Sequence, residues 1–323
     1  MGQRTPDARP RVVIARYIPD AGRLILAASF DVDEGTARID RAGLLRRVRG
    51  AHAIVADPTV PVDAELLDAA GDGLRVVANF AVGYDNVDVD ACRARGVVVT
   101  NTPDVLTNAT AELTLALMLA AARRLGEGER MVRAGEWGGW EPGQLLGREL
   151  SRAVVGIVGL GRIGARVAEL LRPFGCVLLS TTRTPHPDAE ARLGAERVPL
   201  DDLLSRADLV SLHVPLTAET RHLIGDRALG RMKRGAVLVN TARGGLVDSA
   251  ALAAALRDGR LFAAGLDVYE GEPLVPPALR GLENVVLAPH LGSATSVARD
   301  GMARLAADNV VAVLDGRDPV TPV

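Results

Sequence analysis

The chain has 323 residues, 48% of them hydrophobic, and its 38 basic and 40 acidic side chains give a formal net charge of −2. This length predicts two globular domains, and the balanced charge predicts that the protein binds no nucleic acid. The two cysteines, Cys92 and Cys176, match neither a disulfide framework nor a metal motif, so no metal is expected. The sequence has no signal-peptide pattern and no apolar run long enough to span a membrane, which predicts a cytoplasmic protein without membrane contact.

Short β-branched runs alternate with helical patterns along the first third of the chain. The expected strands are residues 12–15, 30–32, 53–56, 76–80 and 97–100, and the expected helices are residues 19–28, 41–49, 63–70 and 88–95. Alternation at this spacing predicts a parallel sheet covered by helices, which is one doubly wound domain. Residues 1–10 form a polar tail that we expect to be disordered at its start.

A long apolar helix is expected at residues 109–124, as a buried connection into a second domain. The composition then changes to Gly, Trp and charged residues over 123–150, which contains the only tryptophans, Trp137 and Trp140. We expect this segment to be either an excursion from the core or an arm onto a partner subunit.

A G-x-G-x-x-G turn at residues 159–164 organises the second half of the chain. It lies between an apolar strand at 154–158 and a helix at 162–173, and a second strand at 176–181 completes a βαβ unit. The glycines permit a tight turn, close approach of the backbone to a pyrophosphate and close packing of helix on strand, and the helix N-terminus favours a phosphate. The predicted dinucleotide contacts here are Gly159, Gly161, Arg162, Ile163 and Gly164.

The end of the second strand indicates which dinucleotide binds. NAD enzymes place Asp or Glu about 20 residues beyond the motif to hold the ribose 2′-hydroxyl. This chain has Thr182, Arg183 and Thr184 there. Because a guanidinium with flanking hydroxyls suits a 2′-phosphate, NADP(H) is the preferred cofactor, with NAD(H) as the alternative. The other interpretation is that Arg183 is only a solvated loop arginine.

Three later connections carry reactive side chains. The expected strands are residues 208–214, 236–241, 263–268 and 285–288, and a last helix at 296–314 is expected to begin at a Ser N-cap. Arg243, Glu272 and His290 lie on the connections after the last three strands, at the edge where open parallel sheets bind ligands. Alone, each is as readily an ordinary loop residue; together they offer a carboxylate clamp, an acid that tunes a histidine, and a proton donor. Of the other histidines, His52 and His213 are expected in or beside the core, and His186 and His222 on the surface.

Four motifs occur in a fixed order: GLGRIG, NTARGG, AAGLDVYEGEP and APHLGSAT. In this order they resemble the D-isomer-specific 2-hydroxyacid dehydrogenase family, and the resemblance extends from about Val12 to the C-terminus. Two further segments are especially similar to the glyoxylate/hydroxypyruvate reductase branch: NFAVGYDNVDVDACRARGVVVTNTPDVLTNATAELTLALML and HVPLTAETRHLIG.

The resemblance implies roles for individual residues. Arg243 would hold the substrate carboxylate, His290 would donate the proton, and Glu272 would hydrogen-bond His290. An adjacent carboxylate favours the imidazolium form, which agrees with these roles. The further implied substrate contacts are the backbone of Val82 and Gly83, then Ser293, and Trp140 at the active site of a neighbouring subunit. The further implied cofactor contacts are Val214, Pro215, Thr241, Ala242, Asp267 and Gly292.

The resemblance also implies the architecture and the activity. The expected fold is α/β, with two doubly wound parallel-sheet domains: a discontinuous flavodoxin-like substrate domain at residues 1–106 plus 296–323, and a Rossmann cofactor domain at 107–295. The expected protein is a homodimer joined through residues 123–150, which reduces glyoxylate or hydroxypyruvate with NADPH. The alternatives are a 2-ketogluconate reductase, a phosphite dehydrogenase, or a non-catalytic NAD(P)-sensing regulator. The intact Arg243, Glu272 and His290 argue against the last.

Overall fold

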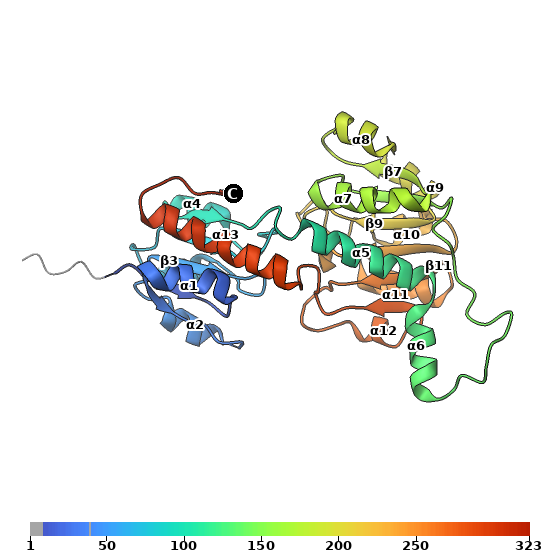
Figure 1. Cartoon of the computed structure of the whole chain (residues 1–323), viewed down its shortest axis with the longest axis horizontal. Coiled ribbons are helices and arrows are strands. Elements are labelled where there is room, and N and C mark those ends of the chain that lie inside the picture. Colours follow the sequence, from blue (N-terminus) through green and yellow to red (C-terminus); the bar gives the residue numbers. More distant parts are fainter. Residues whose placement is uncertain (1–8, 39) are drawn as a thin grey trace, which may run out of the picture. The chain divides into compact units, whose positions relative to one another are not determined.

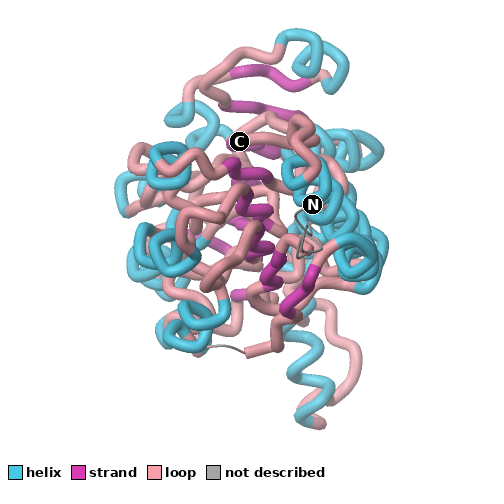
Figure 2. Tube along the Cα trace, turned by 90° about the vertical axis from the view of Figure 1, so that its left-hand side faces the viewer, coloured by secondary structure: helices cyan, strands magenta, loops and turns pink. Residues whose placement is uncertain are grey.

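The computed structural model describes residues 9–38 and 40–323, so most of the expected N-terminal tail lies outside the described residues. The chain divides into two compact units, Met1–Leu106 with Thr295–Val323 and Thr107–Ala294 (Figure 1). Figure 2 shows helices on both sides of the strands. The predicted fold class, two parallel-sheet α/β domains, is confirmed.

The first unit is built on a five-stranded parallel sheet of order β2-β1-β3-β4-β5. This is the flavodoxin-like order. The strands are β1 (Arg11–Ile14), β2 (Asp31–Asp33), β3 (Ala53–Ala56), β4 (Val76–Asn79) and β5 (Val98–Thr100). The helices are α1 (Asp20–Ser29), α2 (Arg41–Arg47), α3 (Ala64–Ala70), α4 (Val89–Ala94) and α13 (Ser296–Leu314). Every residue of β3 and β4 is buried, as expected for strands covered on both faces.

Helix α13, from the end of the chain, packs on α1 of the same unit. A Cβ added at Gly22 of α1 would lie 2.2 Å from the Ala303 carbonyl oxygen, so only glycine allows this approach. The N-cap of this helix is Thr295, one residue before the Ser296 that the sequence predicted. The Thr295 hydroxyl accepts a hydrogen bond from the Ala298 N–H at 3.1 Å.

The second unit is built on a seven-stranded parallel sheet of order β12-β11-β10-β9-β6-β7-β8. The strands are β6 (Val154–Val158), β7 (Val177–Thr181), β8 (Ala195–Arg197), β9 (Leu209–Leu212), β10 (Ala236–Asn240), β11 (Leu261–Leu266) and β12 (Val285–Leu287). The α-helices are α5 (Thr107–Ala122), α6 (Leu125–Ala134), α7 (Arg162–Leu171), α8 (Pro187–Leu193), α9 (Leu200–Arg206), α10 (Asp226–Arg231), α11 (Ser249–Arg257) and α12 (Pro277–Arg280). The edge strand β8 was not predicted, because it has only three residues and two of them are charged.

Separate apolar clusters fill the two faces of this sheet. Helices α5 and α7 contribute Met118 and Leu171 to one, and α9 and α11 contribute Leu203 and Leu252 to the other. The alternating side chains of the buried strands supply both clusters. Within the described residues, no helix is long and apolar enough to cross a membrane.

Residues 123–150 leave the body of the second unit. The helix α6 and the loop after it project outward (Figure 1), and the Trp137 and Trp140 side chains are 54% and 80% exposed. The sequence predicted an excursion here but not the helix, because α6 contains two glycines and buries no residue.

Candidate active site

The three motif glycines are required for different reasons. Gly159 has φ 96°, and a Cβ added there would lie 2.7 Å from the His213 carbonyl oxygen. A Cβ at Gly164 would lie 2.0 Å from the Gly159 carbonyl oxygen, because α7 rests directly on the turn. Gly159 therefore lets the turn pack against the end of β9, and Gly164 lets α7 pack on β6.

Gly161 is different, because a Cβ added there would meet nothing within 4 Å. It is the N-cap of α7, and no side chain caps this helix. The first turn also contains no acidic residue, so the partial positive charge of the helix end is not neutralised there. Open space beside uncapped N–H groups fits a dinucleotide pyrophosphate, which Arg162 and Ile163 of the same turn would also contact.

The segment after β7 carries no carboxylate at residues 182–184. The Thr182 hydroxyl donates to the Thr184 carbonyl at 2.9 Å, and the Arg183 side chain is exposed. A hydrogen bond from Thr217 and the nearby charge of Arg183 both lower the pKa of Glu219. Arg183 therefore approaches the connection after β9, which begins with His213, Val214 and Pro215.

Asn240, at the end of β10, shapes the turn that carries Arg243. Its side-chain amide donates to the Arg243 carbonyl at 2.8 Å, and its side-chain oxygen accepts from the Ala242 N–H at 3.0 Å. A Cβ at Gly244 would lie 1.9 Å from the carbonyl carbon of Tyr269, so this turn packs directly on the connection after β11. Arg243 is half-buried, and Thr241, at the start of the turn, is buried.

Glu272 and His290 form a hydrogen-bonded pair. His290 Nδ1 lies 2.8 Å from Glu272 Oε2, and Glu272 Oε1 accepts from the Tyr269 N–H at 2.9 Å. Burial opposes ionisation of Glu272. The bonds from His290 and Tyr269, together with the charges of His290 and Arg243, outweigh it and lower the pKa of this carboxyl. The carboxylate is therefore ionised where it meets the imidazole.

Asp267 holds the loop that carries His290. Its fully buried carboxylate accepts from the N–H groups of Leu291 at 2.6 Å and Gly292 at 2.8 Å, and the His290 N–H donates to its backbone oxygen at 2.9 Å. Burial is the main cause that raises the pKa of Asp267. His290 has φ 56°, a left-handed conformation that costs energy in a non-glycine residue and is often found at functional sites.

The remaining predicted substrate contacts lie on three different segments of the chain. Val82 and Gly83 follow β4 in the first unit, and their carbonyl oxygens accept bonds from Asn101 at 2.8 Å and Asn79 at 2.9 Å. Within the described residues, the N–H groups of Val82 and Gly83 donate to no protein acceptor, which leaves them available to an anion. Ser293 follows Gly292 and is half-buried, whereas Trp140 is exposed on the projecting loop.

Comparisons with known proteins identify the family. Residues 115–292 match the sequence model of the "D-isomer specific 2-hydroxyacid dehydrogenase, NAD binding domain". The chain belongs to this family. It is an NAD(P)-dependent oxidoreductase, which confirms the predicted class of enzyme.

Several relatives are similar to this dehydrogenase over nearly their whole length. Glyoxylate reductases of Thermococcus onnurineus and Pyrococcus horikoshii are 48% and 46% identical to it, over 98% of this chain and 96% of each relative. A crystal structure of a protein from Thermus thermophilus has a TM-score of 0.90 at 46% identity, over 97% of this chain and 99% of that one. The NADPH-dependent glyoxylate/hydroxypyruvate reductase of Sinorhizobium meliloti, in complex with NADP and malonate, has a TM-score of 0.87 at 38% identity, over 98% and 97%. These relatives support 2-oxoacid reductase activity.

Sequence reasoning missed two pairs in this dehydrogenase. His222, expected to be merely exposed, lies 2.6 Å from Glu270. Ser211 lies 2.9 Å from His213, and burial lowers the pKa of His213 to about 4. The first pair depends on how two distant connections pack, whereas the second joins residues only two apart in the chain.

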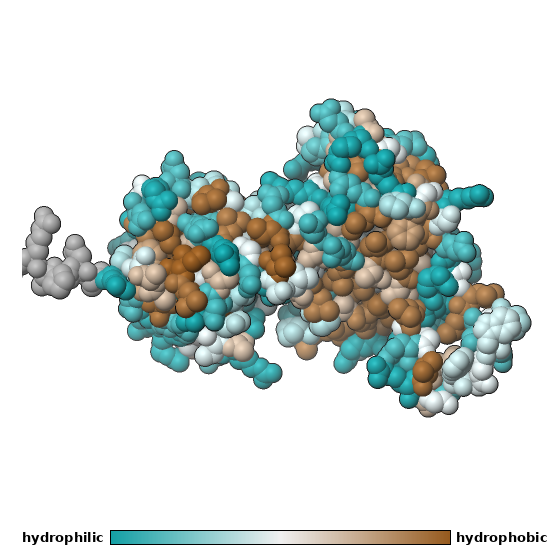
Figure 3. Space-filling model, in the orientation of Figure 1, coloured by the Kyte–Doolittle hydropathy of each residue, from teal (hydrophilic) through white to brown (hydrophobic). Residues whose placement is uncertain are grey.

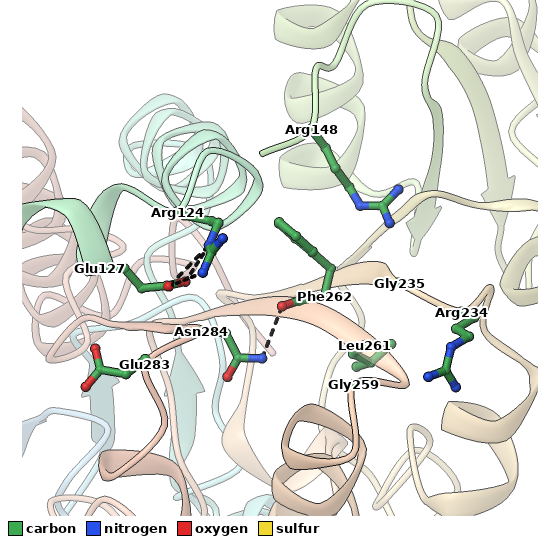
Figure 4. Close-up of a pocket in the computed structure, with 10 residues that line it drawn as sticks. All are labelled: Arg124, Glu127, Arg148, Arg234, Gly235, Gly259, Leu261, Phe262, Glu283 and Asn284. Carbon is green, nitrogen blue, oxygen red and sulfur yellow. Dashed lines mark hydrogen bonds and ion pairs between the residues drawn. The ribbon is translucent and has the colours of Figure 1, made fainter. Parts of the chain in front are cut away.

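A hollow of about 590 Å³ lies at the other end of the second sheet, where β10 and β11 begin (Figure 4). Arg148 and Arg234 border it, and the Arg148 guanidinium lies 5.1 Å from the centre of the Phe262 ring. None of the predicted site residues lines it. The described residues contain no group of three or more His, Cys, Asp or Glu side chains that could hold a metal ion.

Proposed function

We propose that the protein reduces glyoxylate or hydroxypyruvate to the corresponding 2-hydroxy acid and prefers NADPH. The observation that carries this proposal is the joint placement of Arg243 and the Glu272–His290 pair on adjacent connections at the carboxyl edge of a Rossmann-type sheet. The glyoxylate reductases that are 46–48% identical support the substrate class.

The chemistry divides between the cofactor and the chain. NADPH, when bound, supplies a hydride from its nicotinamide ring. The Arg243 guanidinium binds the substrate carboxylate and so places the carbonyl carbon. As negative charge develops on the carbonyl oxygen, His290 donates a proton to it, and the oxo acid, one hydride and one proton give the hydroxy acid. Glu272 orients the imidazole through Nδ1, which leaves Nε2 to face the oxygen.

Support for NADPH comes from residues 182–184. The strand-end position that would hold the ribose hydroxyls offers Thr182 and Arg183 instead of a carboxylate. The Sinorhizobium meliloti relative, described as NADPH-dependent, is 38% identical.

We also propose that the protein is a homodimer in which residues 123–150 contact the partner and Trp140 approaches its active site. Helix α5 is apolar nearly all round, with Leu113, Leu115 and Leu119 only half-buried. Figure 3 shows hydrophobic residues gathered on the face of the second unit over this helix. A second copy that covers this face would remove apolar surface from water.

The direct test is the loss of NADPH absorbance with glyoxylate, with hydroxypyruvate and with 2-ketogluconate. Phosphite is assayed separately with NADP⁺, by the gain of NADPH absorbance. His290→Asn is the matched control, and we expect at least about a 100-fold loss of turnover. Binding of NADPH without turnover of any of these substrates would instead favour a non-catalytic regulator.

A further inference from the structure

Two glutamates on one turn each meet a histidine. Glu272 binds His290, and Glu270 Oε1 lies 2.6 Å from His222 Nε2. Gly271 between them has φ 74°, which favours glycine and lets the two carboxylates reach different connections. The turn after β11 therefore bonds to the connection after β9 as well as to the connection after β12.

Glu270 also binds the start of α11, which follows the Arg243 turn. Its Oε2 accepts from the Ser249 N–H at 3.1 Å, while the Asp248 side chain accepts from the next two N–H groups at 3.0 Å each. Carboxylates here satisfy N–H groups that lack a helical partner and suit the helix dipole. Burial opposes ionisation of Glu270, but the bonds from His222 and Ser249 outweigh it and lower the pKa of its carboxyl.

His222 is itself fixed against the Arg243 turn. Its N–H donates to the Gly245 carbonyl at 2.8 Å, and the Ile224 N–H donates to the Leu246 carbonyl at 3.0 Å. His222 has φ 51°, a left-handed conformation that persists only where surrounding contacts hold it. A Cβ at Gly245 would lie 3.0 Å from Leu216 Cδ2, so the segment after Pro215 packs closely on this turn.

We infer that His222 and Glu270 form a positioning pair for proton transfer: they lock the connections after β9, β10 and β11 together and so hold Glu272 against His290. This inference rests on the proposed function, because it assigns the pair a part in the same site. If the proton donor, His290, is displaced by up to about one ångström, turnover becomes slower while cofactor binding is not weakened. The pair acts through Glu272 and contacts neither substrate nor cofactor in this assignment.

The kinetic test compares Glu270→Ala, Glu270→Gln, His222→Ala and the double variant Glu270→Ala/His222→Ala. We expect Glu270→Ala to lower kcat about 10-fold with the KM for NADPH unchanged within about 2-fold. The deuterium isotope effect with NADPH labelled at the transferred position should rise, because hydride and proton transfer become slower than product release. Glu270→Gln keeps an acceptor for Ser249 and a neutral bond to His222, so it should stay within about 3-fold of wild type.

The double variant tests whether the two residues act as a unit. Its kcat should match that of Glu270→Ala within about 2-fold, whereas independent residues would multiply their losses. Glu196→Ala is the matched control, because Glu196 forms an exposed pair with Arg206 at 2.6 Å on the far edge of the same sheet. An unchanged kcat in Glu270→Ala, or equal losses in Glu270→Ala and Glu196→Ala, overturns the inference.

A second measurement does not depend on turnover. In protein labelled with ¹³C-histidine, the ring resonance of His290, assigned by its loss in His290→Asn, should shift in Glu270→Ala and not in Glu196→Ala. A His290 resonance that stays in place overturns the positioning role whatever the substrate is. Absent wild-type turnover combined with a shifted resonance would instead refute the proposed function and retain the structural coupling.

Discussion

His290 Nδ1 and Glu272 Oε2 lie 2.8 Å apart, although 18 residues separate them in the chain. The carboxylate stabilises the charged imidazole that proton donation requires. The pKa of Glu272 is lowered, so the stabilisation from this ionised pair is fully present above the ordinary glutamate pKa of about 4.3. It is lost only as the pH falls through the lowered pKa.

We therefore predict that Glu272→Gln lowers kcat and removes the acidic limb of the kcat profile, because the amide cannot ionise and makes no charged bond to the imidazole. The measurement is reduction of glyoxylate between about pH 3 and 9, with circular dichroism as a control for folding. A profile that keeps its shape and position would rule out the coupling.

Arg243→Ala should act on the substrate. We expect kcat/KM for the oxo acid to fall by at least about 100-fold, which corresponds to about 3 kcal/mol for a lost charged pair. The NADPH dissociation constant, measured by fluorescence, should stay within about 2-fold. If cofactor affinity collapses with activity, Arg243 does not have the role assigned here.

The motif glycines separate binding from packing. Gly161→Ala adds a Cβ in open space, so the protein should fold normally while NADPH affinity falls by at least about 10-fold, because the methyl group occupies the space left for the pyrophosphate. Gly164→Ala drives a Cβ toward the Gly159 carbonyl and should lower the free energy of unfolding by about 1–3 kcal/mol even without cofactor.

Gly230→Ala, on the last turn of α10 with open space around it, is the control for both and should be neutral or stabilising. Thermal unfolding with and without NADPH distinguishes the variants. Equal behaviour of Gly161→Ala and Gly230→Ala would contradict a cofactor at the helix end.

Cofactor preference should follow Arg183. Charge-assisted hydrogen bonds contribute about 1.5–3 kcal/mol, so wild type should prefer NADPH by about one to two decades in kcat/KM. Arg183→Ala should lose most of this preference through NADPH alone, and Thr182→Asp should reverse it by repelling the 2′-phosphate. Steady-state kinetics with both cofactors test this, and a wild-type preference for NADH would show Arg183 to be a surface arginine.

The dimer predicts a mass near twice 33.9 kDa by light scattering at micromolar concentration. Trp140→Ala should lower kcat/KM, because the indole would no longer approach the partner's active site. The residue is 80% exposed within its own chain, so its removal should leave the protein dimeric. Leu125→Ala, an exposed residue at the start of α6, serves as the matched control. A monomeric wild type would refute the arrangement.

The sequence alone determined the local features of this protein. The apolar β-branched runs and their helical partners predicted two parallel α/β layers, because their periodicities of about 2 and 3.6 residues reflect burial directly. The spacing of Gly159, Gly161 and Gly164 predicted the cofactor turn, since Gly159 and Gly164 meet backbone that leaves no room for a Cβ and Gly161 leaves open space at the helix N-terminus. The edge strand β8 escaped notice because two of its three residues are charged, and the helix α6 because it contains two glycines and buries no residue.

Only the tertiary structure decided which side chains meet. The family resemblance implied the bond between Glu272 and His290, but nothing in the sequence indicated that Glu270, on the other side of Gly271, binds His222. Likewise, a buried carboxylate at Asp267 makes sense only beside the N–H groups of Leu291 and Gly292, 24 and 25 residues away. Such pairs form because parallel strands bring distant connections to one sheet edge, and the energy of each pair depends on that geometry and not on its neighbours in sequence.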